Sequence, residues 1–112
     1  MDPQTIALLR DEIGLDVLVE LSQLFLEESE SAVVEIQEAT DALDAERLRK
    51  SAHSLKGASL NMGARQLANV CEIIERRARD VELEGISSLV HQMKINYQLA
   101  CAELTKIIET GE

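Results

Sequence analysis

The sequence contains two histidines, His53 and His91, and these are the first residues to consider for nucleophilic chemistry. A neutral imidazole nitrogen is a competent nucleophile near pH 7 and can accept a phosphoryl group. His91 has no acidic residue three or four positions away, and its place in a helical pattern requires only a surface role. His53 is therefore the candidate nucleophile.

The residues that follow His53 suit an anionic ligand. Lys56 lies three positions on, so the two side chains share a face of a helix, and the ammonium can offset the charge of a phosphoryl group. Gly57 costs a helix roughly 1 kcal/mol relative to Ala, which favours a site where a side chain would obstruct an approaching partner. The alternative for Gly57 is close packing against another helix.

Positive charge is concentrated around the same residues. Eight of the eleven Lys and Arg fall between positions 47 and 79 with only two acids, so this segment has a net charge of +6 in a chain of net charge −10. Such a segment suggests contact with an anionic group or an acidic partner, and a solvated helix face is the alternative. The negative total argues against nucleic acid and anionic membranes as partners. The eight are Arg47, Arg49, Lys50, Lys56, Arg65, Arg76, Arg77 and Arg79.

The elements that must position these side chains are helices. Leu, Ala, Ile, Glu and Gln dominate, while the chain has one Phe, one Tyr, one Pro and no Trp. Apolar residues recur at three- and four-residue steps. We predict a short helix over 3–13, a long one from 15, one from about 45 that ends near Gly63, one over 64–80 and one from about 85. Asp2 and Asp44 are the predicted N-caps, and Gly14 is a predicted helix end.

The apolar stripes define a predicted core. At 112 residues the chain fits one domain, residues 1–112, and four amphipathic helices joined by short connections predict an all-α, up-down-up-down antiparallel four-helix bundle with a short additional N-terminal helix. The predicted core residues are Leu18, Leu21, Phe25, Ala32, Ile36, Ala39, Leu43, Leu48, Ala52, Leu55, Ser59, Leu67, Val70, Cys71, Ile74, Ala78, Ile86, Val90, Met93, Tyr97, Ala100, Leu104 and Ile107.

One face of the helix over 64–80 carries Glu72, Glu75 and Arg79. If this face adjoins His53, Glu75 could accept a hydrogen bond from the imidazole Nδ1–H, which would fix the tautomer and leave Nε2 free to attack. Arg79 could then join Lys56 against the phosphoryl oxygens. The alternative is that the two glutamates pair with Arg76 and Arg79 along their own helix.

The run from His53 to Ala64, His-Ser-Leu-Lys-Gly-Ala-Ser-Leu-Asn-Met-Gly-Ala, is followed by Leu67 and by Cys71-Glu72. This pattern closely resembles the signature of histidine-containing phosphotransfer domains, and the resemblance extends from Phe25 to the final helix. It implies that His53 is an exposed phosphoryl carrier. Family members often have Gln where this chain has Glu75.

The resemblance also implies partners. The chain would accept a phosphoryl group on His53 from a receiver-domain aspartate of a hybrid sensor histidine kinase and pass it to a response-regulator aspartate. It would need no cofactor of its own, because the receiver supplies the divalent metal. Lys56 and Arg79 would stabilise the phosphoryl group and Glu75 would orient the ring. The residues expected to contact the partner are Gly57, Leu60, Arg49, Lys50 and Arg76, with part of the first two helices.

The sequence also bears on autophosphorylation, oligomeric state, location and rival functions. No nucleotide-binding loop is visible, so autophosphorylation is not expected. The chain is expected to be a monomer. The start of the chain does not read as a signal peptide and no apolar run could span a bilayer, which with Cys71 and Cys101 as reduced, buried thiols favours the cytoplasm. The rival function is a helical bundle that binds a signalling partner without phosphorylation. A di-metal enzyme is disfavoured, because Glu-x-x-His pairs are lacking.

Overall fold

The computed structural model describes residues 3–110. Its helices are α1 (Pro3–Ile13), α2 (Leu15–Asp41), α3 (Ala45–Asn61), α4 (Arg65–Arg79) and α5 (Ile86–Thr110). The predicted bounds agree with these to within one or two residues. The predicted cap Asp2 lies outside the described residues.

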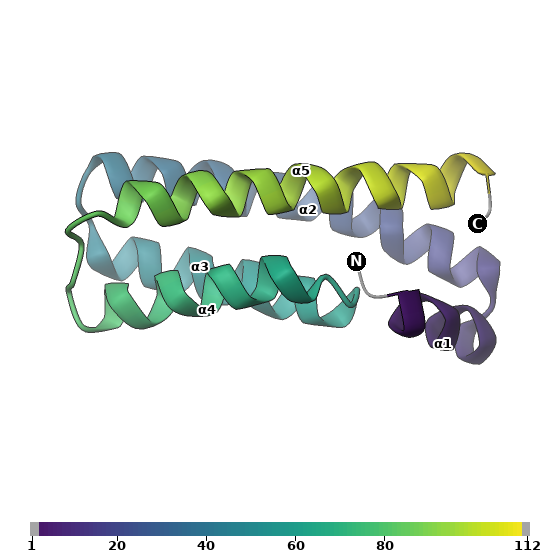
Figure 1. The fold of residues 1–112 in the computed structure, drawn as a ribbon. Coiled ribbons are helices and arrows are strands. Elements are labelled where there is room, and N and C mark those ends of the chain that lie inside the picture. Colours follow the sequence, from purple (N-terminus) through teal and green to yellow (C-terminus); the bar gives the residue numbers. More distant parts are fainter. Residues whose placement is uncertain (1–2, 111–112) are drawn as a thin grey trace.

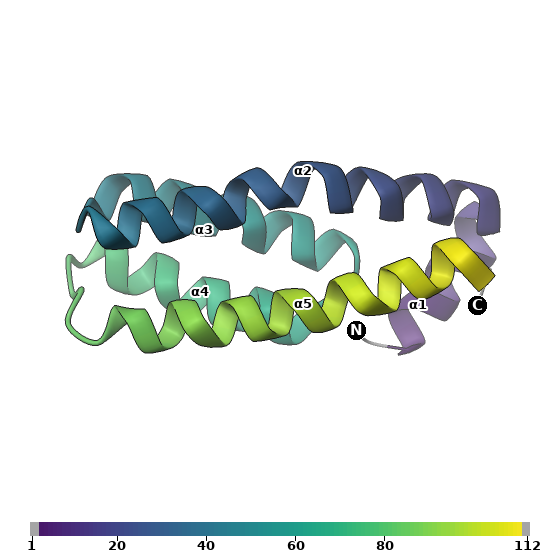
Figure 2. The same cartoon turned by 90° about the horizontal axis from the view of Figure 1, so that it is seen from above.

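Helices α2 to α5 form an antiparallel bundle in which each helix packs against the next and α5 packs against α2 (Figure 1). Figure 2, turned by 90°, shows the same order around the bundle axis. Within residues 3–110, α1 packs against α2 alone, where α2 extends past the shorter α3. The predicted fold class is confirmed. None of the described helices has the length and apolar character needed to cross a membrane.

The predicted start of α3 is confirmed by its cap. The Asp44 carboxylate accepts a hydrogen bond from the Arg47 backbone N–H at 3.2 Å, which satisfies one of the free donors of the first turn. Gly14 follows α1 and Gly63 follows the C-cap of α3. Their φ values are +83° and +72°, a left-handed conformation that is strained for residues with a side chain.

Two other helix ends use the left-handed conformation without glycine. Leu43 and Val81 have φ values of +53° and +55°. In each case the following amide closes the turn: Asp44 N–H donates to Ala39 O at 2.9 Å, and Glu82 N–H donates to Arg77 O at 2.8 Å. This is the Schellman arrangement, in which glycine is the usual residue. Nothing in the residue types marked Leu43 and Val81 for it.

The core follows the predicted stripes with few exceptions. Leu18, Phe25 and Ile36 of α2 are buried, as are all the predicted core residues of α3 and α4. The prediction was wrong for Leu43, which is 67% exposed because it lies in the turn after α2, and for Leu21, which is 38% exposed in the part of α2 that extends beyond α3.

Candidate functional site

One face of α3 carries His53 and the residues predicted to act with it. Arg49, His53, Lys56 and Leu60 follow one another at three- and four-residue steps, so they line a single side of the helix. The His53 side chain is 65% exposed, which leaves the ring open to a partner. Helix α4 packs along α3 and supplies the acidic side chains that meet this face.

His53 is held by Glu75 from the neighbouring helix. The distance from His53 Nδ1 to Glu75 Oε2 is 2.8 Å, and the Glu75 side chain is only 14% exposed. Burial raises the pKa of Glu75, but hydrogen bonds from Lys56 and His53 outweigh it, so the pKa lies below its ordinary value. The group is therefore a carboxylate near pH 7, Nδ1–H donates to it, and the lone pair of the ring lies on Nε2.

Lys56 is bound by two carboxylates of α4. Its Nζ lies 2.8 Å from Glu72 Oε2 and 2.6 Å from Glu75 Oε1. The hydrogen bonds to Glu72 and then Glu75 raise the pKa of Lys56, so its ammonium stays charged. The alternative in which these glutamates pair along α4 is wrong, because both pair with side chains of α3. The predicted contact of Glu75 with His53 is present.

Gly57 faces open space. A Cβ built on it would meet no heavy atom of the rest of the molecule within 4 Å. Close packing against another helix therefore does not explain this glycine. Leu60, one turn further, is an apolar side chain that is 57% exposed. Both residues leave the surface beside His53 free for a partner.

The other predicted basic residues lie on α3 and α4, the two helices that carry His53 and Glu75. Arg49 forms a two-point pair with Glu46, at 2.7 and 3.1 Å, and Lys50 Nζ lies 3.9 Å from the same carboxylate. Arg76 and Arg79 are exposed on α4, and Arg79 Nε lies 3.7 Å from Asp80 Oδ1. The contact of Arg79 with a phosphoryl group stays a prediction.

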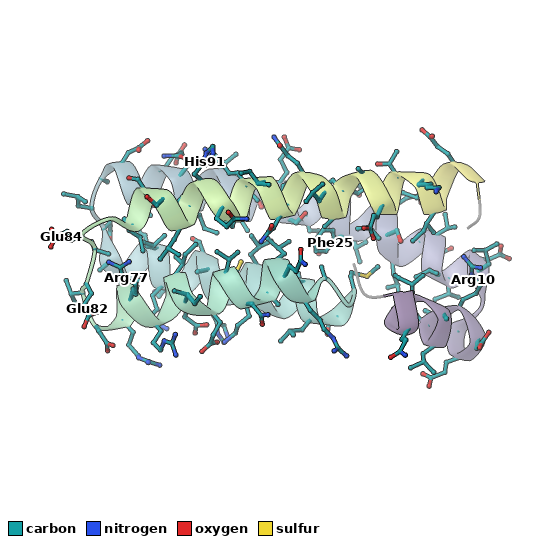
Figure 3. All side chains as sticks on the ribbon, viewed as in Figure 1. Arg10, Phe25, Arg77, Glu82, Glu84 and His91 are labelled. Carbon is teal, nitrogen blue, oxygen red and sulfur yellow. The ribbon has the colours of Figure 1, made fainter. Side chains whose placement is uncertain are left out.

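The other candidate side chains lie away from this face. His91 is exposed on α5 and points to solvent (Figure 3). Cys71 is buried, and burial raises the pKa of its thiol to about 12, so it stays protonated. Cys101 is only half-buried, which departs from the prediction for it, and burial raises its pKa as well. No cluster of metal-ligating side chains occurs among residues 3–110.

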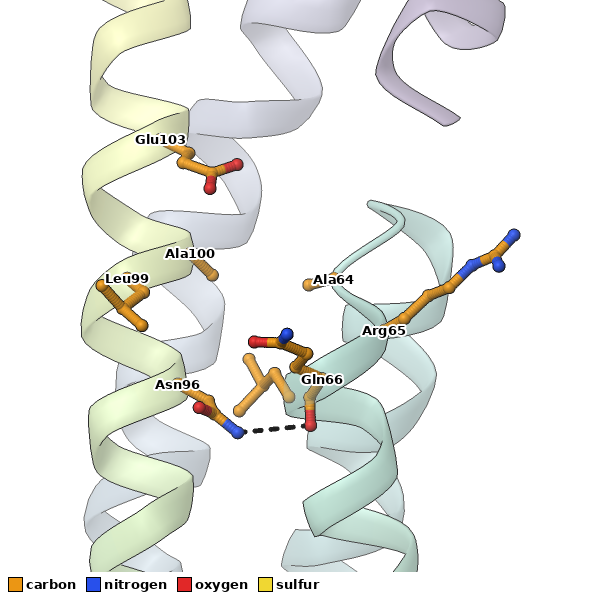
Figure 4. A pocket seen from close by; sticks show the side chains of 8 residues that line it. Ala64, Arg65, Gln66, Asn96, Leu99, Ala100 and Glu103 are labelled. Carbon is orange, nitrogen blue, oxygen red and sulfur yellow. Dashed lines mark hydrogen bonds between the residues drawn. The ribbon is translucent and has the colours of Figure 1, made fainter. Parts of the chain in front are cut away.

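A hollow in the described surface lies away from His53. It has a volume of about 370 Å³ and lies between the start of α4 and the middle of α5 (Figure 4). Asn96 Nδ2 donates to Gln66 O across it at 3.4 Å. Glu75, which contacts His53, is not among the residues that line this hollow.

Comparison with known proteins agrees with this geometry. The family model described as the Hpt domain matches residues 20–109, which is most of the chain. The chain belongs to the Hpt domain family. The solved Hpt protein B (HptB) of Pseudomonas aeruginosa PAO1 superimposes with a TM-score of 0.90 at 33% identity, over 97% of this chain and 94% of that one.

Two rice proteins are also similar to this Hpt domain. "Pseudo histidine-containing phosphotransfer protein 2" of Oryza sativa subsp. japonica is 30% identical over 88 residues, which are 77% of this chain and 58% of that protein. "Histidine-containing phosphotransfer protein 1" of the same organism is 29% identical over 83 residues, 69% of this chain and 56% of that protein. The chain thus spans under three fifths of the length of these relatives, and one of them is named a pseudo form.

Proposed function

We propose that this Hpt domain carries a phosphoryl group on His53 Nε2 between receiver domains of a phosphorelay. The observation that carries the proposal is the pair of His53 with Glu75: Nδ1 is 2.8 Å from a mostly buried carboxylate, while the His53 side chain is 65% exposed. An imidazole held in this way has its nucleophilic nitrogen fixed and directed outward. One relative is named a pseudo form, so membership of the family does not by itself decide whether a chain carries a phosphoryl group. The proposal therefore rests on the contacts of His53.

The proposed transfer is an in-line displacement. His53 Nε2 attacks the phosphorus of a receiver aspartyl phosphate, so that an N–P bond forms while the O–P bond breaks and its electron pair stays with the receiver carboxylate. The proton on Nδ1 remains on the ring, and the resulting cationic phosphoimidazole is paired with Glu75. An aspartate of a second receiver reverses these steps and takes the phosphoryl group.

The surroundings of His53 support a receiver as the partner. A divalent metal bound by the receiver would neutralise charge on the phosphoryl oxygens, and Lys56 would contribute an ammonium from this side. Receiver active sites are acidic, so Arg49, Lys50 and Arg76 give a complementary rim. Leu60 and the open surface at Gly57 provide an apolar contact next to the reacting nitrogen.

The sequence has no nucleotide-binding loop, so we propose that a kinase or receiver donates the phosphoryl group and that the chain has no autokinase activity. Hybrid sensor kinases and response regulators carry the receiver domains that would serve as donor and acceptor. The monomeric state and the cytoplasmic location stay predictions.

The test is phosphoryl transfer from a labelled receiver. Wild type, His53→Gln and His91→Gln are each mixed with a phosphorylated receiver domain and Mg²⁺, and protein-bound label that is acid-labile and alkali-stable is followed. We expect label on the wild type and on His91→Gln, and none on His53→Gln. Absence of label on the wild type across a broad panel of receivers would favour a bundle that binds partners without phosphorylation.

A further inference from the structure

Lys56 has more negative charge around it than its own charge can neutralise. Its Nζ contacts Glu72 Oε2 at 2.8 Å and Glu75 Oε1 at 2.6 Å, and its side chain is mostly buried between them. The three groups together carry one net negative charge near pH 7. A phosphoryl group on His53 would arrive beside this cluster with further negative charge.

The two carboxylates differ in what else they contact. Glu75 also accepts the hydrogen bond from His53 Nδ1, so it has a role in holding the ring. Among the described residues, Lys56 is the one side chain that pairs with Glu72, and the Glu72 side chain is half-exposed. Glu72 therefore neither holds the imidazole nor fills the core. Its effect on the site passes through Lys56.

A lysine ammonium has three N–H donors; one of them donates to Glu72 Oε2, and Glu75 Oε1 forms an ion pair with the same ammonium. An anion that arrives at His53 must share this ammonium with carboxylates already bound to it. We propose that Glu72 competes with the phosphoryl group for Lys56, and that it thereby lowers the equilibrium phosphorylation of His53 and favours donation to a receiver. Glu72 is then a positioning residue that sets the transfer equilibrium.

This inference rests on the carrier function proposed above. It differs from a role in which Glu72 merely holds Lys56 in place. In that case removal of the carboxylate would release Lys56 and lower the phosphorylation of His53. Competition has the opposite sign, since removal of the carboxylate frees the ammonium for the phosphoryl group.

The experiment measures the equilibrium between phosphorylated receiver and phosphorylated His53. Wild type and Glu72→Gln are each mixed with one phosphorylated receiver, and the ratio of the two labelled proteins is followed until it is constant. Glutamine keeps the size of the side chain and an acceptor oxygen but removes the charge. We expect the equilibrium constant for phosphorylation of His53 to rise roughly two- to fivefold, the range to which the energies of exposed ion pairs correspond.

Two further variants control the measurement. Glu84→Gln makes the same change in net charge at the end of the bundle (Figure 3), and it leaves the Glu84 carbonyl that accepts from Arg77 in place. We expect it to have no effect. In a Lys56→Gln background the effect of Glu72→Gln should disappear, because the group for which Glu72 competes is gone. Weakening of the Glu72→Gln effect as salt is raised is also expected.

The outcomes are distinct. An unchanged or lowered equilibrium constant for Glu72→Gln, with the wild type labelled normally, would overturn the role of Glu72 and leave the carrier function intact. A full effect in the Lys56→Gln background would also overturn it, because Glu72 would then act without Lys56. A wild type that takes no label from any receiver would count against the carrier function and, with it, this inference.

Discussion

His53 and His91 are both exposed histidines on the surface of the same bundle. Within residues 3–110, only His53 of the two is hydrogen-bonded to a side chain of a neighbouring helix. His53 meets Glu75 and lies beside Lys56, because α3 and α4 pack together along this face. His91 lies on α5, and in the described part of the chain no acidic side chain pairs with it. The difference lies in the neighbouring helix and not in the exposure of the ring.

This comparison shows how a helical bundle orients an imidazole ring on an open surface. The carboxylate that orients the ring is mostly buried, whereas the ring itself is mostly exposed, at 14% and 65% of the side-chain area. The fold therefore fixes the tautomer from inside and leaves Nε2 to a partner. Substitutions in single parts of this arrangement, or in a part of the molecule remote from it, test what each part contributes.

The largest effect is expected from a side chain at Gly57. A Cβ there meets open space, so Gly57→Gln should fold at least as well as the wild type, because Gly is a poor helix former. The side chain would project into the proposed docking surface. We expect phosphotransfer to slow by at least about 30-fold, the size of a strong interface perturbation, while urea denaturation shows no loss of stability.

Gly57→Ala is the matched control. It adds one methyl group, and we expect it to stabilise α3 by about 0.5–1 kcal/mol with a much smaller effect on transfer. Equal slowing in both variants would show that helix flexibility at Gly57, and not room for a partner, is what transfer requires.

A smaller effect is expected at the residue that distinguishes the two histidines. Glu75→Leu removes the acceptor for Nδ1–H, and we expect transfer about tenfold slower, as loss of one charge-assisted hydrogen bond would give. Glu75→Gln keeps an acceptor oxygen and should stay within about threefold of the wild type. Single-turnover rates with a phosphorylated receiver measure both. Equal loss in the two variants would mean that the charge of Glu75 matters, and not its hydrogen bond.

A change far from His53 should affect stability alone. Val81 is a β-branched residue at φ +55° and is 69% exposed, so Val81→Gly relieves a left-handed strain and loses little packing. We expect the free energy of unfolding to rise by about 0.5–1 kcal/mol, after the entropy of the added glycine is included. Val81→Ala keeps the strain and should give no such gain. Transfer should be unchanged in both.

The smallest effect concerns pH. The pKa of Glu75 is lowered in the folded protein, so its carboxylate contributes stability above the ordinary glutamate pKa of about 4.3, and this contribution is lost as the pH falls through the lowered value. The free energy of unfolding of the wild type relative to Glu75→Gln should fall by less than about 1 kcal/mol as the pH is lowered from about 5 through the lowered pKa of Glu75. A relative stability that does not fall below about pH 5 would contradict the pairing.

Most of the fold was predictable because helix signals are local. Asp44 and Gly14 mark ends of helices, and the apolar spacing marks the faces that become buried. Leu43 and Val81 were missed as left-handed helix ends because their residue types favour other conformations. Leu21 was misassigned to the core because its exposure depends on where α3 ends beside α2.

The site was predictable where it follows from one helix. His53, Lys56 and Gly57 share a short segment of α3, so their proximity needs no tertiary information. The contact of His53 with Glu75 needed the phase of α4 as well, and helical periodicity supplied it. The pairing of Lys56 with Glu72 was missed, because the partner of Glu72 depends on the register between α3 and α4, which no local pattern determines.

The most direct test of the account locates the phosphoryl group itself. The protein, with its imidazoles labelled with ¹⁵N, is phosphorylated by a receiver and studied by NMR at pH 8, where the coupling between phosphorus and ring nitrogen identifies the modified atom. We predict one modified site, Nε2 of His53, with His91 unchanged. A phosphoryl group on Nδ1 of His53, on His91 or on another residue would contradict it.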